Sequence, residues 1–345
     1  MVEKAARARR VSMVDVAREA GVSQKTVSRV VNDEPYVAVD VRERVLAVIE
    51  RLGFRPNAAA RALVTRRSHR IGVVAMGGTT LHGPTSVLAG VEAAARRAGY
   101  TLSVIRTEPG GRDEIQAAVD ALAGQGVEAV VISEPVDVGG APIDIPEGVE
   151  VLTFGMGNAT SHPRELVVGA DESGCARDAT DHLLAQGHAV VDHIAGPSDW
   201  LSSRSRTAGW RRALVDGGVA PPEPVAGDWT PAGGFSAMSA LIDRGGCTAV
   251  FVANDQMAIG AMSAIQRAGL RVPEDVAVVG FDDIDVAAYL AVPLTTVRQD
   301  FAETSRVGMH RLLRALDGHV HDDLHRTLPA QLVIRASSTA SPAAG

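Results

Sequence analysis

Apolar residues near the start of the chain recur at three- and four-residue spacing, which is typical of short amphipathic helices. Ser12 and Asp15 open the first such segment in the arrangement of a capping box, so we predict a helix that begins there and runs to Ala20. Gly21 can adopt the positive φ of a tight turn, and Ser23 can cap a second helix. The buried side of the second helix would be formed by Val27, Val30 and Val31.

A third helix is predicted over residues 41–52, where valine, isoleucine and leucine side chains again share one face. Gly53 ends this helix, and Pro56 prevents its continuation. Two short helices joined by a tight turn, the second with polar side chains opposite its apolar stripe, form the helix-turn-helix pattern. The third helix would close the core of this small unit.

The polar face of the second helix predicts contacts with duplex DNA. Gln24, Lys25 and Arg29 have the length and the donors to reach base edges in the major groove. Thr26 and Ser28 are suited to phosphate contacts. We therefore predict that the DNA-binding set of this segment is Ser23, Gln24, Lys25, Thr26, Ser28 and Arg29.

From Ile71 onward the pattern changes to short apolar runs separated by helical stretches. The runs begin near positions 71, 101, 127, 149, 190, 249 and 275 and are typical of strands buried on both faces. Helical spacing occurs between them at residues 87–98, 112–123, 174–184 and 256–268. This alternation predicts an α/β fold with doubly wound parallel sheets. The chain is long enough for two such halves, with a cleft at the carboxyl ends of their strands.

Charge is distributed unevenly along the 345 residues, although the formal net charge is only −7. Residues 1–70 contain 15 Lys and Arg against 8 Asp and Glu, whereas the remaining residues contain 19 against 33. A basic head on an acidic body favours phosphate binding by the head. On charge alone, a basic helical bundle that is merely solvated stays open as the alternative.

Several other classes of protein and site are disfavoured. No apolar run reaches the roughly 18 residues that cross a bilayer, and no apolar signal core follows MVEKAARARR, so we expect a cytoplasmic, nucleoid-associated protein without a membrane partner. Cys175 and Cys247 match no metal spacing and are expected to be buried thiols. Residues 319–325 contain histidines without a closed ligand set, and no phosphate-loop or nucleophile-elbow signature is present. We expect no metal, no cofactor and no enzymatic activity.

Two segments, MVDVAREAGVSQKTVSRVVN and VRERVLAVIERLGFRPNAAARAL, resemble the start of the lactose-repressor (LacI) family of bacterial transcription regulators. The similarity continues almost to the C-terminus, through LHGP, SRSRTAGW, GDW, VANDQMAIGAM, GLRVPEDVAVVGFDD and PLTTVRQDF in that order. One departure is Ala38, where the family usually has a serine that caps the third helix. Asp40 can replace part of that cap through the helix dipole.

The resemblance implies a particular domain organisation. An all-α helix-turn-helix headpiece would span residues 1–56 and a hinge 57–69. A sugar-binding regulatory and dimerisation core, similar to periplasmic binding proteins and built of two doubly wound parallel-sheet subdomains, would span 70–335. Its N-subdomain would comprise about 70–168 and 301–328, its C-subdomain about 169–298 and 329–338, and a disordered tail would follow at 336–345.

The resemblance also assigns a role to the hinge, where Asn57 can cap a short alanine-rich helix. Such a helix is marginal in water, and in the family it forms when two subunits dock on DNA. Leu63, helped by Ala60 and Arg61, would then insert into the minor groove and kink the duplex. A flexible linker is the alternative interpretation of this stretch.

Polar side chains that follow the predicted strands are suited to a polyol, which needs carboxylate, amide and guanidinium partners and an aromatic face. The resemblance assigns the sugar contacts to Arg206, Trp229, Asn254, Asp282, Gln299 and Phe301, with Ser202 in a neighbouring loop. It assigns the apolar side of the cleft to Leu81, Gly83, Pro84 and Val87. Alternatives stay open: Arg206 could pair with Asp282, Trp229 could be ordinary packing, and Asp255 and Asp283 could have structural roles, Asp255 as a helix cap. Trp210 is expected in the core.

A second departure concerns the sugar itself. The resemblance implies an aspartate after the fourth strand of the core, but LTFGMG places Gly155 or Met156 there, with the loss of two acceptors. Trp200, in a loop beside the cleft, adds a possible stacking face. The effector is therefore expected to be a sugar whose identity stays open.

The predicted function is a repressor of sugar-utilisation genes that a small carbohydrate releases from a pseudo-palindromic, double-stranded operator. Such a site requires at least two recognition helices, and the end of the chain, RASSTASPAAG, has no leucine heptads, so a homodimer is expected. The ligand could instead act as a co-repressor. Two other classes stay open as alternatives: a sugar-binding protein without DNA binding, and a cytoplasmic sugar enzyme.

Overall fold

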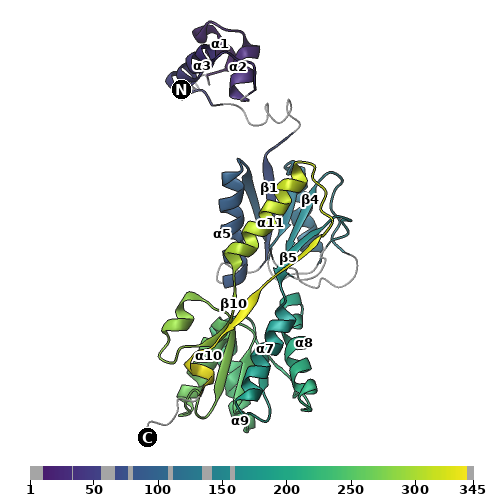
Figure 1. Ribbon diagram of the computed structural model, residues 1–345, viewed down its shortest axis with the longest axis vertical. Helices are drawn as coiled ribbons and strands as arrows, with labels where there is room; N and C mark the ends of the chain where they lie inside the picture. The colour runs from purple at the N-terminus through teal and green to yellow at the C-terminus, as the bar shows by residue number, and fades with distance from the viewer. Residues whose placement is uncertain are drawn as a thin grey trace, which may run out of the picture. The chain divides into compact units, whose positions relative to one another are not determined.

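The structure is a computed structural model that describes residues 11–32, 34–55, 67–76, 81–107, 112–133, 142–155 and 160–339 (Figure 1). The chain divides into two compact units, Met1–Ser68 and His69–Gly345. Each unit has its own hydrophobic core, and each is described separately below.

The first unit contains three helices, α1 (Met13–Ala20), α2 (Gln24–Val31) and α3 (Val39–Leu52). The predicted capping box is confirmed, because Ser12 Oγ accepts from the Asp15 amide and the Asp15 carboxylate accepts from the Ser12 amide. Gly21 ends α1 with a φ of 64°, in the left-handed region that favours glycine. Ala38 provides no side-chain cap for α3, as expected, although the helix begins two residues earlier than predicted.

A small core holds these helices together. It is formed by the buried side chains of Val16, Ala17, Ala20, Val27, Val30, Val45, Val48 and Phe54. These residues include the predicted stripe of α2, except that Val31 is only partly buried. The polar side of α2 is therefore left on the surface.

The second unit contains two six-stranded sheets among its described residues, and we call the two halves the N-lobe and the C-lobe. The N-lobe sheet has the order β11-β5-β4-β3-β1-β2, with every pairing parallel. Its strands are β1 (Arg70–Met76), β2 (Thr101–Thr107), β3 (Ala129–Ile132), β4 (Glu150–Phe154), β5 (Leu166–Ala170) and β11 (His325–Leu328). The C-lobe sheet has the order β12-β10-β9-β8-β6-β7, in which only the β10–β12 pairing is antiparallel. Its strands are β6 (Asp192–Ala195), β7 (Val225–Ala226), β8 (Ala249–Val252), β9 (Ala277–Asp282), β10 (Thr295–Gln299) and β12 (Ala330–Val333).

Helices cover both faces of each sheet, which confirms the predicted doubly wound fold. The N-lobe carries α5 (His82–Arg97), α6 (Arg112–Gly124) and α11 (Phe301–Leu316), and α11 lies beside α5 (Figure 1). The C-lobe carries α7 (Glu172–Ala185), α8 (Leu201–Asp216), α9 (Pro231–Arg244) and α10 (Asp255–Arg267), with the short 3₁₀ helices η1 (Asp285–Tyr289) and η2 (Ala336–Ser338). Successive residues of β1 point to opposite faces of the N-lobe sheet. Val73 packs with α5 and α11 on one face, whereas Val74 packs with α6 on the other. None of the helices in the described ranges has the length and apolar character of a membrane span.

The chain passes between the lobes three times within the described residues: from β5 to α7, from β10 to α11, and from β11 to β12. These crossings place the carboxyl ends of the parallel strands at the boundary between the lobes. Open α/β sheets bind ligands at that edge. The fold therefore positions a site where the lobes meet.

Two expectations about the core are wrong. Residues 202–205, expected in a loop, belong to α8 because the helix already begins at Leu201. Residues 336–338 were expected both at the end of the C-subdomain and at the start of a disordered tail; the tail assignment is wrong for them, because they form η2, where Ser337 and Ser338 are buried against the C-lobe. The Ser337 hydroxyl donates to the carbonyl of Val278 at 2.6 Å, which fixes this segment to β9.

Candidate functional site

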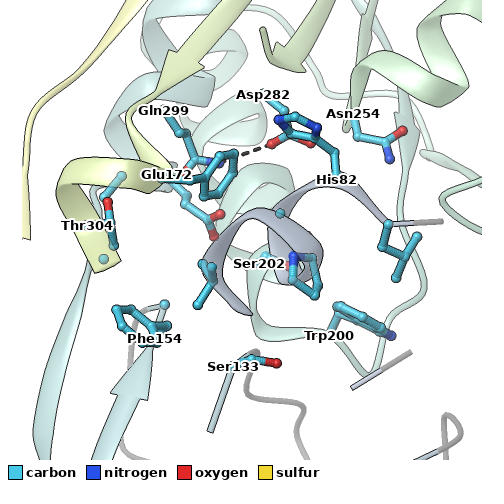
Figure 2. A pocket seen from close by; sticks show the side chains of 18 of the residues that line it. His82, Ser133, Phe154, Glu172, Trp200, Ser202, Asn254, Asp282, Gln299 and Thr304 are labelled. Carbon is cyan, nitrogen blue, oxygen red and sulfur yellow. Dashed lines mark hydrogen bonds between the residues drawn. The ribbon is translucent and has the colours of Figure 1, made fainter. Parts of the chain in front are cut away.

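A cavity lies between the lobes and contains about 680 Å³ of free volume, including space open to solvent. All of the predicted ligand-binding residues line it, namely Leu81, Gly83, Pro84, Val87, Ser202, Arg206, Trp229, Asn254, Asp282, Gln299 and Phe301. Figure 2 labels four of them, Ser202, Asn254, Asp282 and Gln299. The structure thus brings together residues that lie more than 200 positions apart in the sequence.

The guanidinium of Arg206 is the centre of the polar part of this cavity. One terminal nitrogen donates to the carbonyl of Ala253 at 2.6 Å, and the other donates to Glu172 Oε1 at 2.6 Å. Asp282 Oδ1 lies 3.6 Å from the second nitrogen, and the ring of Phe281 lies 4.0 Å below the guanidinium carbon. Arg206, Glu172 and Asp282 are all buried, so the charges are paired out of bulk water. The ion pair of Arg206 with Asp282, which the sequence left open as an alternative, is therefore longer than the ion pair of Arg206 with Glu172.

Asp282 is the last residue of β9 and has a φ of 108°, which is unusual for a residue other than glycine. Its Oδ1 accepts from Gln299 Nε2 at 3.1 Å (Figure 2). Burial raises the pKa of Asp282 above its ordinary value, although the Arg206 guanidinium acts in the opposite direction. Gln299 and Arg206 hold the Asp282 carboxyl group at the boundary between the lobes.

Asn254 caps α10, and its Nδ2 donates to the carbonyl of Trp229 at 3.1 Å. The amide therefore links two of the cavity-lining segments. Asp255, the neighbour that was considered as a cap, does not cap the helix. Its carboxylate accepts from the Thr296 hydroxyl at 2.6 Å and from the Ile284 amide at 2.9 Å. Asp255 is fully buried and does not line the cavity, which agrees with a structural role.

Two other residues also have structural positions. Asp283 forms ion pairs with Arg298 at 2.6 Å and with Arg335 at 2.7 Å. Trp210 is fully buried, as expected, and its indole N–H donates to the carbonyl of Val191 at 2.9 Å. None of these contacts involves a cavity-lining group.

The apolar part of the cavity contains Gly155 and two indole rings. Gly155 lines the cavity at the end of β4, where the resemblance implied an aspartate, and Met156 lies outside the described residues. Trp200 is the residue before the first turn of α8, and it meets Trp229 edge to face, with ring centroids 5.7 Å apart. Both indoles are buried and both line the cavity, so Trp229 packs and also faces the site.

Several lining residues were not identified from the sequence: His82, Ser133, Phe154, Gly169, Ala170, Glu172 and Thr304. Glu172 is the most important of them, since it forms the shorter ion pair with Arg206. It follows β5, whose run LVVGA was not recognised as a strand. A polar residue directly after a buried five-residue run was the signal that could have found it.

In the first unit, α2 presents the predicted polar face. Gln24, Lys25 and Arg29 are exposed, whereas Val27 and Val30 are buried on the opposite side. The hydroxyls of Ser23 and Thr26 lie 2.9 Å apart, and the Thr26 amide donates to Ser23 Oγ. Asn32 Nδ2 donates to Ser28 Oγ at 3.4 Å. The predicted hinge residues Asn57, Ala60, Arg61 and Leu63 lie outside the described residues.

The part of the chain that the structure describes contains no cluster of His, Cys, Asp and Glu suited to a metal ion. Burial raises the pKa of the Cys175 thiol to about 11 and that of Cys247 to about 12. Both thiols are therefore protonated at neutral pH and are poor nucleophiles.

Comparisons with known proteins agree with both units. The family model for bacterial regulatory proteins of the lacI family matches residues 12–57, and that for a periplasmic binding protein-like domain matches residues 180–338. The lactose operon repressor of Escherichia coli (strain K12) is 36% identical over 341 residues, which cover 97% of this chain and 94% of that protein. The HTH-type transcriptional regulator CelR of Thermobifida fusca is 34% identical over 340 residues, which cover 96% and 99%.

Solved structures give the same result. The lac repressor dimer bound to operator and the anti-inducer ONPF has a TM-score of 0.85 and 33% identity, covering 96% of this chain and 100% of that chain. The CelR–cellobiose complex has a TM-score of 0.70 and 31% identity, covering 95% and 100%. With an exposed polar face on α2, a cavity between two lobes and this similarity over nearly its whole length, the chain belongs to the LacI family of DNA-binding bacterial transcription regulators.

Proposed function

We propose that this protein represses sugar-utilisation genes by binding a pseudo-palindromic operator as a homodimer, and that a small carbohydrate between its lobes releases it. The observation that supports this most directly is the set of groups around Arg206. Carboxylates, side-chain amides and a guanidinium converge on one cavity, beside two indole rings. These are the partners that the hydroxyls and the C–H face of a polyol require.

On the DNA side, Gln24, Lys25 and Arg29 reach base edges in the major groove, because they are the exposed long side chains of α2. Ser23, Thr26 and Ser28 contact phosphates. The hinge residues Asn57, Ala60, Arg61 and Leu63 act in the minor groove, as the family resemblance implies.

Release of the operator follows from a difference in affinity. A sugar that bridges the Arg206 side of the C-lobe and the Leu81–Val87 side of the N-lobe stabilises one angle between the lobes. It shifts the equilibrium only by as much as it binds that state more tightly than the other. The protein acts on chromosomal DNA in the cytoplasm, and it binds its ligand without converting it.

Fluorescence anisotropy tests this proposal. A duplex selected from a random library by the full-length protein is titrated with and without saccharides. Arg29→Ala should lose sequence-specific binding and retain saccharide binding. Arg206→Lys keeps the buried charge but not the guanidinium fork, so it should bind the duplex normally and need at least about tenfold more saccharide for release, which is about 1.4 kcal/mol.

Two results would contradict the proposal. One is selection of no sequence from the library, with only salt-sensitive, sequence-independent binding. The other is formation of a hydrolysis product from a bound glycoside, which would indicate an enzyme. An increase of duplex affinity with saccharide would reverse the sign and make the ligand a co-repressor.

A further inference from the structure

We infer that Glu128 is a positioning residue for operator binding. It fixes the backbone of His69, the first residue of the second unit, and so determines how firmly the helix-turn-helix units of a dimer are placed over their half-sites. The inference rests on the proposed function, because it requires a dimer on a pseudo-palindromic operator. It concerns the amino ends of the N-lobe strands, which form the edge of the sheet opposite the cavity.

The first argument is the backbone of His69. Its φ is 51°, in the left-handed region that residues other than glycine rarely adopt. The residue ends the predicted hinge, and Arg70, the next residue, begins β1. We call these two residues the junction. A strained conformation persists only where the surrounding structure enforces it, so the contacts of His69 show what holds the junction.

The second argument is that both backbone polar groups of His69 are held. The amide donates to Glu128 Oε1 at 2.7 Å. The carbonyl accepts from the amide of Thr101 at 2.9 Å and from its hydroxyl at 3.3 Å. Thr101 begins β2, and Glu128 directly precedes β3, the two strands that pair with β1. The junction is therefore fixed from both sides of its strand.

The third argument is that Glu128 is itself anchored to the N-lobe. Its Oε2 accepts from the hydroxyl of Tyr100 at 3.4 Å, and its amide donates to the carbonyl of Arg70 at 2.9 Å. Tyr100 is buried in the N-lobe core, and the centroid of its ring lies 5.1 Å from that of His69. Hydrogen bonds from an N–H to a carboxylate are among the strong ones in proteins. Glu128 thus connects the junction to the core of the lobe.

A fixed junction matters because a dimer reads two half-sites at a defined spacing. One extra base pair between them moves the half-sites apart by about 3.4 Å and rotates one against the other by roughly 35°. DNA-binding units on a firm junction cannot follow this change. Units on a loose junction can follow it, but they bind the correct spacing less tightly, because they lose more freedom on binding. The ratio of the two affinities therefore reports how firmly the junction is held.

Fluorescence anisotropy on the full-length protein measures this ratio. The probes are the duplex selected from a random library and the same duplex with one base pair inserted at its centre. Wild type should bind the original duplex at least about tenfold more tightly than the lengthened one. Glu128→Ala removes the side-chain contacts with His69 and Tyr100, and it should lower the ratio at least about threefold. A loss of active protein alone would weaken both titrations alike and leave the ratio unchanged.

Two further variants separate geometry from charge and from position. Glu128→Gln loses the charge but keeps an oxygen that accepts from the His69 amide, so its ratio should stay close to the wild-type value. Glu150→Ala is the matched control. Glu150 begins β4 at the same edge of the sheet, and its carboxylate pairs with Arg164 at 2.7 Å, so its loss should leave the ratio unchanged.

His69→Gly tests the junction from the other partner. Glycine adopts a φ of 51° without strain and lacks the ring that packs near Tyr100, so the junction gains freedom although its backbone hydrogen bonds can still form. The ratio should fall in this variant as it does in Glu128→Ala. Urea unfolding of the same samples shows whether the ratio and the stability change independently.

The failures of the inference and of the proposed function are distinct. A wild-type ratio in Glu128→Ala, or an equal fall in Glu150→Ala, would overturn the inference. An equal fall in Glu128→Gln would assign the effect to charge and would overturn it as well, as would a wild-type protein that binds both duplexes equally. Selection of no duplex from the library would instead contradict the proposed function.

Discussion

Three residues other than glycine have left-handed backbone conformations at or beside the cavity. They are Trp229, Asp282 and Asp283, with φ values of 69°, 108° and 53°. Each such conformation costs on the order of 1–3 kcal/mol and persists only where its surroundings enforce it. Here Asn254 holds the carbonyl of Trp229, and two arginines hold the carboxylate of Asp283. The strained conformations of Trp229 and Asp282 place these two residues at the cavity.

Asp255 should make the stability of the C-lobe depend on pH. Burial raises its pKa well above the ordinary value, and the nearby Asp282 carboxylate adds to this, despite hydrogen bonds from Thr296 and Ile284. The folded protein thus binds this proton more tightly than the unfolded chain. Its contribution to stability is complete below the unfolded pKa of about 4 and is lost as pH rises through the raised pKa.

Asp255→Asn should remove this dependence, because an amide does not ionise. Relative to wild type, the variant should gain up to about 1.4 kcal/mol of unfolding free energy per pH unit above pH 4 until the raised pKa is passed. Urea unfolding followed between pH 5 and 8 measures the difference. Asp282, whose pKa is also raised, is present in both proteins, so the difference reports Asp255 together with its electrostatic coupling to Asp282. Parallel pH profiles would show that Asp255 does not titrate in this range.

The residues of the site were predictable to different degrees. Asn254 and Asp282 follow long apolar runs, so their place at a strand end could be read from the sequence, and the family resemblance supplied Arg206 and Gln299. Glu172 was missed because the strand before it went unrecognised. The positive φ values of Asp282 and Trp229 could not be predicted, because hydrophobic patterning does not report backbone conformation and residues other than glycine rarely adopt positive φ.

At the level of elements, helix pairs approach each other through glycines. In α10, a Cβ on Gly260 would lie 1.9 Å from the carbonyl oxygen of Pro231 and 2.8 Å from the amide nitrogen of Phe235, both in α9. A Cβ on Gly209 of α8 would similarly lie 2.0 Å from the carbonyl oxygen of Ser173 in α7. Because these neighbours are backbone atoms, a side chain could be accommodated only by moving a whole helix.

Gly260→Ala should therefore destabilise the C-lobe by about 1–3 kcal/mol or more through overpacking. Gly124→Ala in α6 is the matched control: nothing lies within 4 Å of its Cβ position, and alanine favours the helix by up to about 1 kcal/mol. Urea midpoints at a constant m-value measure both effects. If the two substitutions changed stability equally, the α9–α10 contact would not be as close as described.

The elements found from the sequence are those with long periodic patterns. Runs such as AVFVAN contain a fully buried strand, and Gln256–Ala268 contains most of α10. In contrast, β7 has two residues, and three of the four residues of β11 are exposed, so neither shows an apolar run. Residues 202–205 in the first turns of α8 are expected in a loop, because their serines and arginine give no hydrophobic pattern. The helix packs against α7.

At the scale of the whole molecule, the segment with the helix-turn-helix and the segment with the cavity carry opposite net charges. The first 70 residues carry a net +7, and the acidic remainder of the chain contains the cavity. A phosphate backbone is therefore attracted by one part of the chain and repelled by the other. A ligand in the acidic part can change DNA binding by the basic part through a conformational link between the two parts.

Such a link must be reciprocal. If a saccharide lowers operator affinity by a given factor, typically about 5- to 150-fold, the operator must lower saccharide affinity by the same factor. Calorimetric titration of the saccharide into free protein and into the protein–operator complex, compared with operator anisotropy at zero and saturating saccharide, gives both factors. A duplex of scrambled sequence serves as the control, since it binds mainly through phosphates and should leave saccharide affinity closer to that of free protein. If the operator left saccharide affinity unchanged while saccharide still weakened operator binding, the two effects could not arise from one equilibrium between two lobe arrangements, and release would have to act through a site other than this cavity.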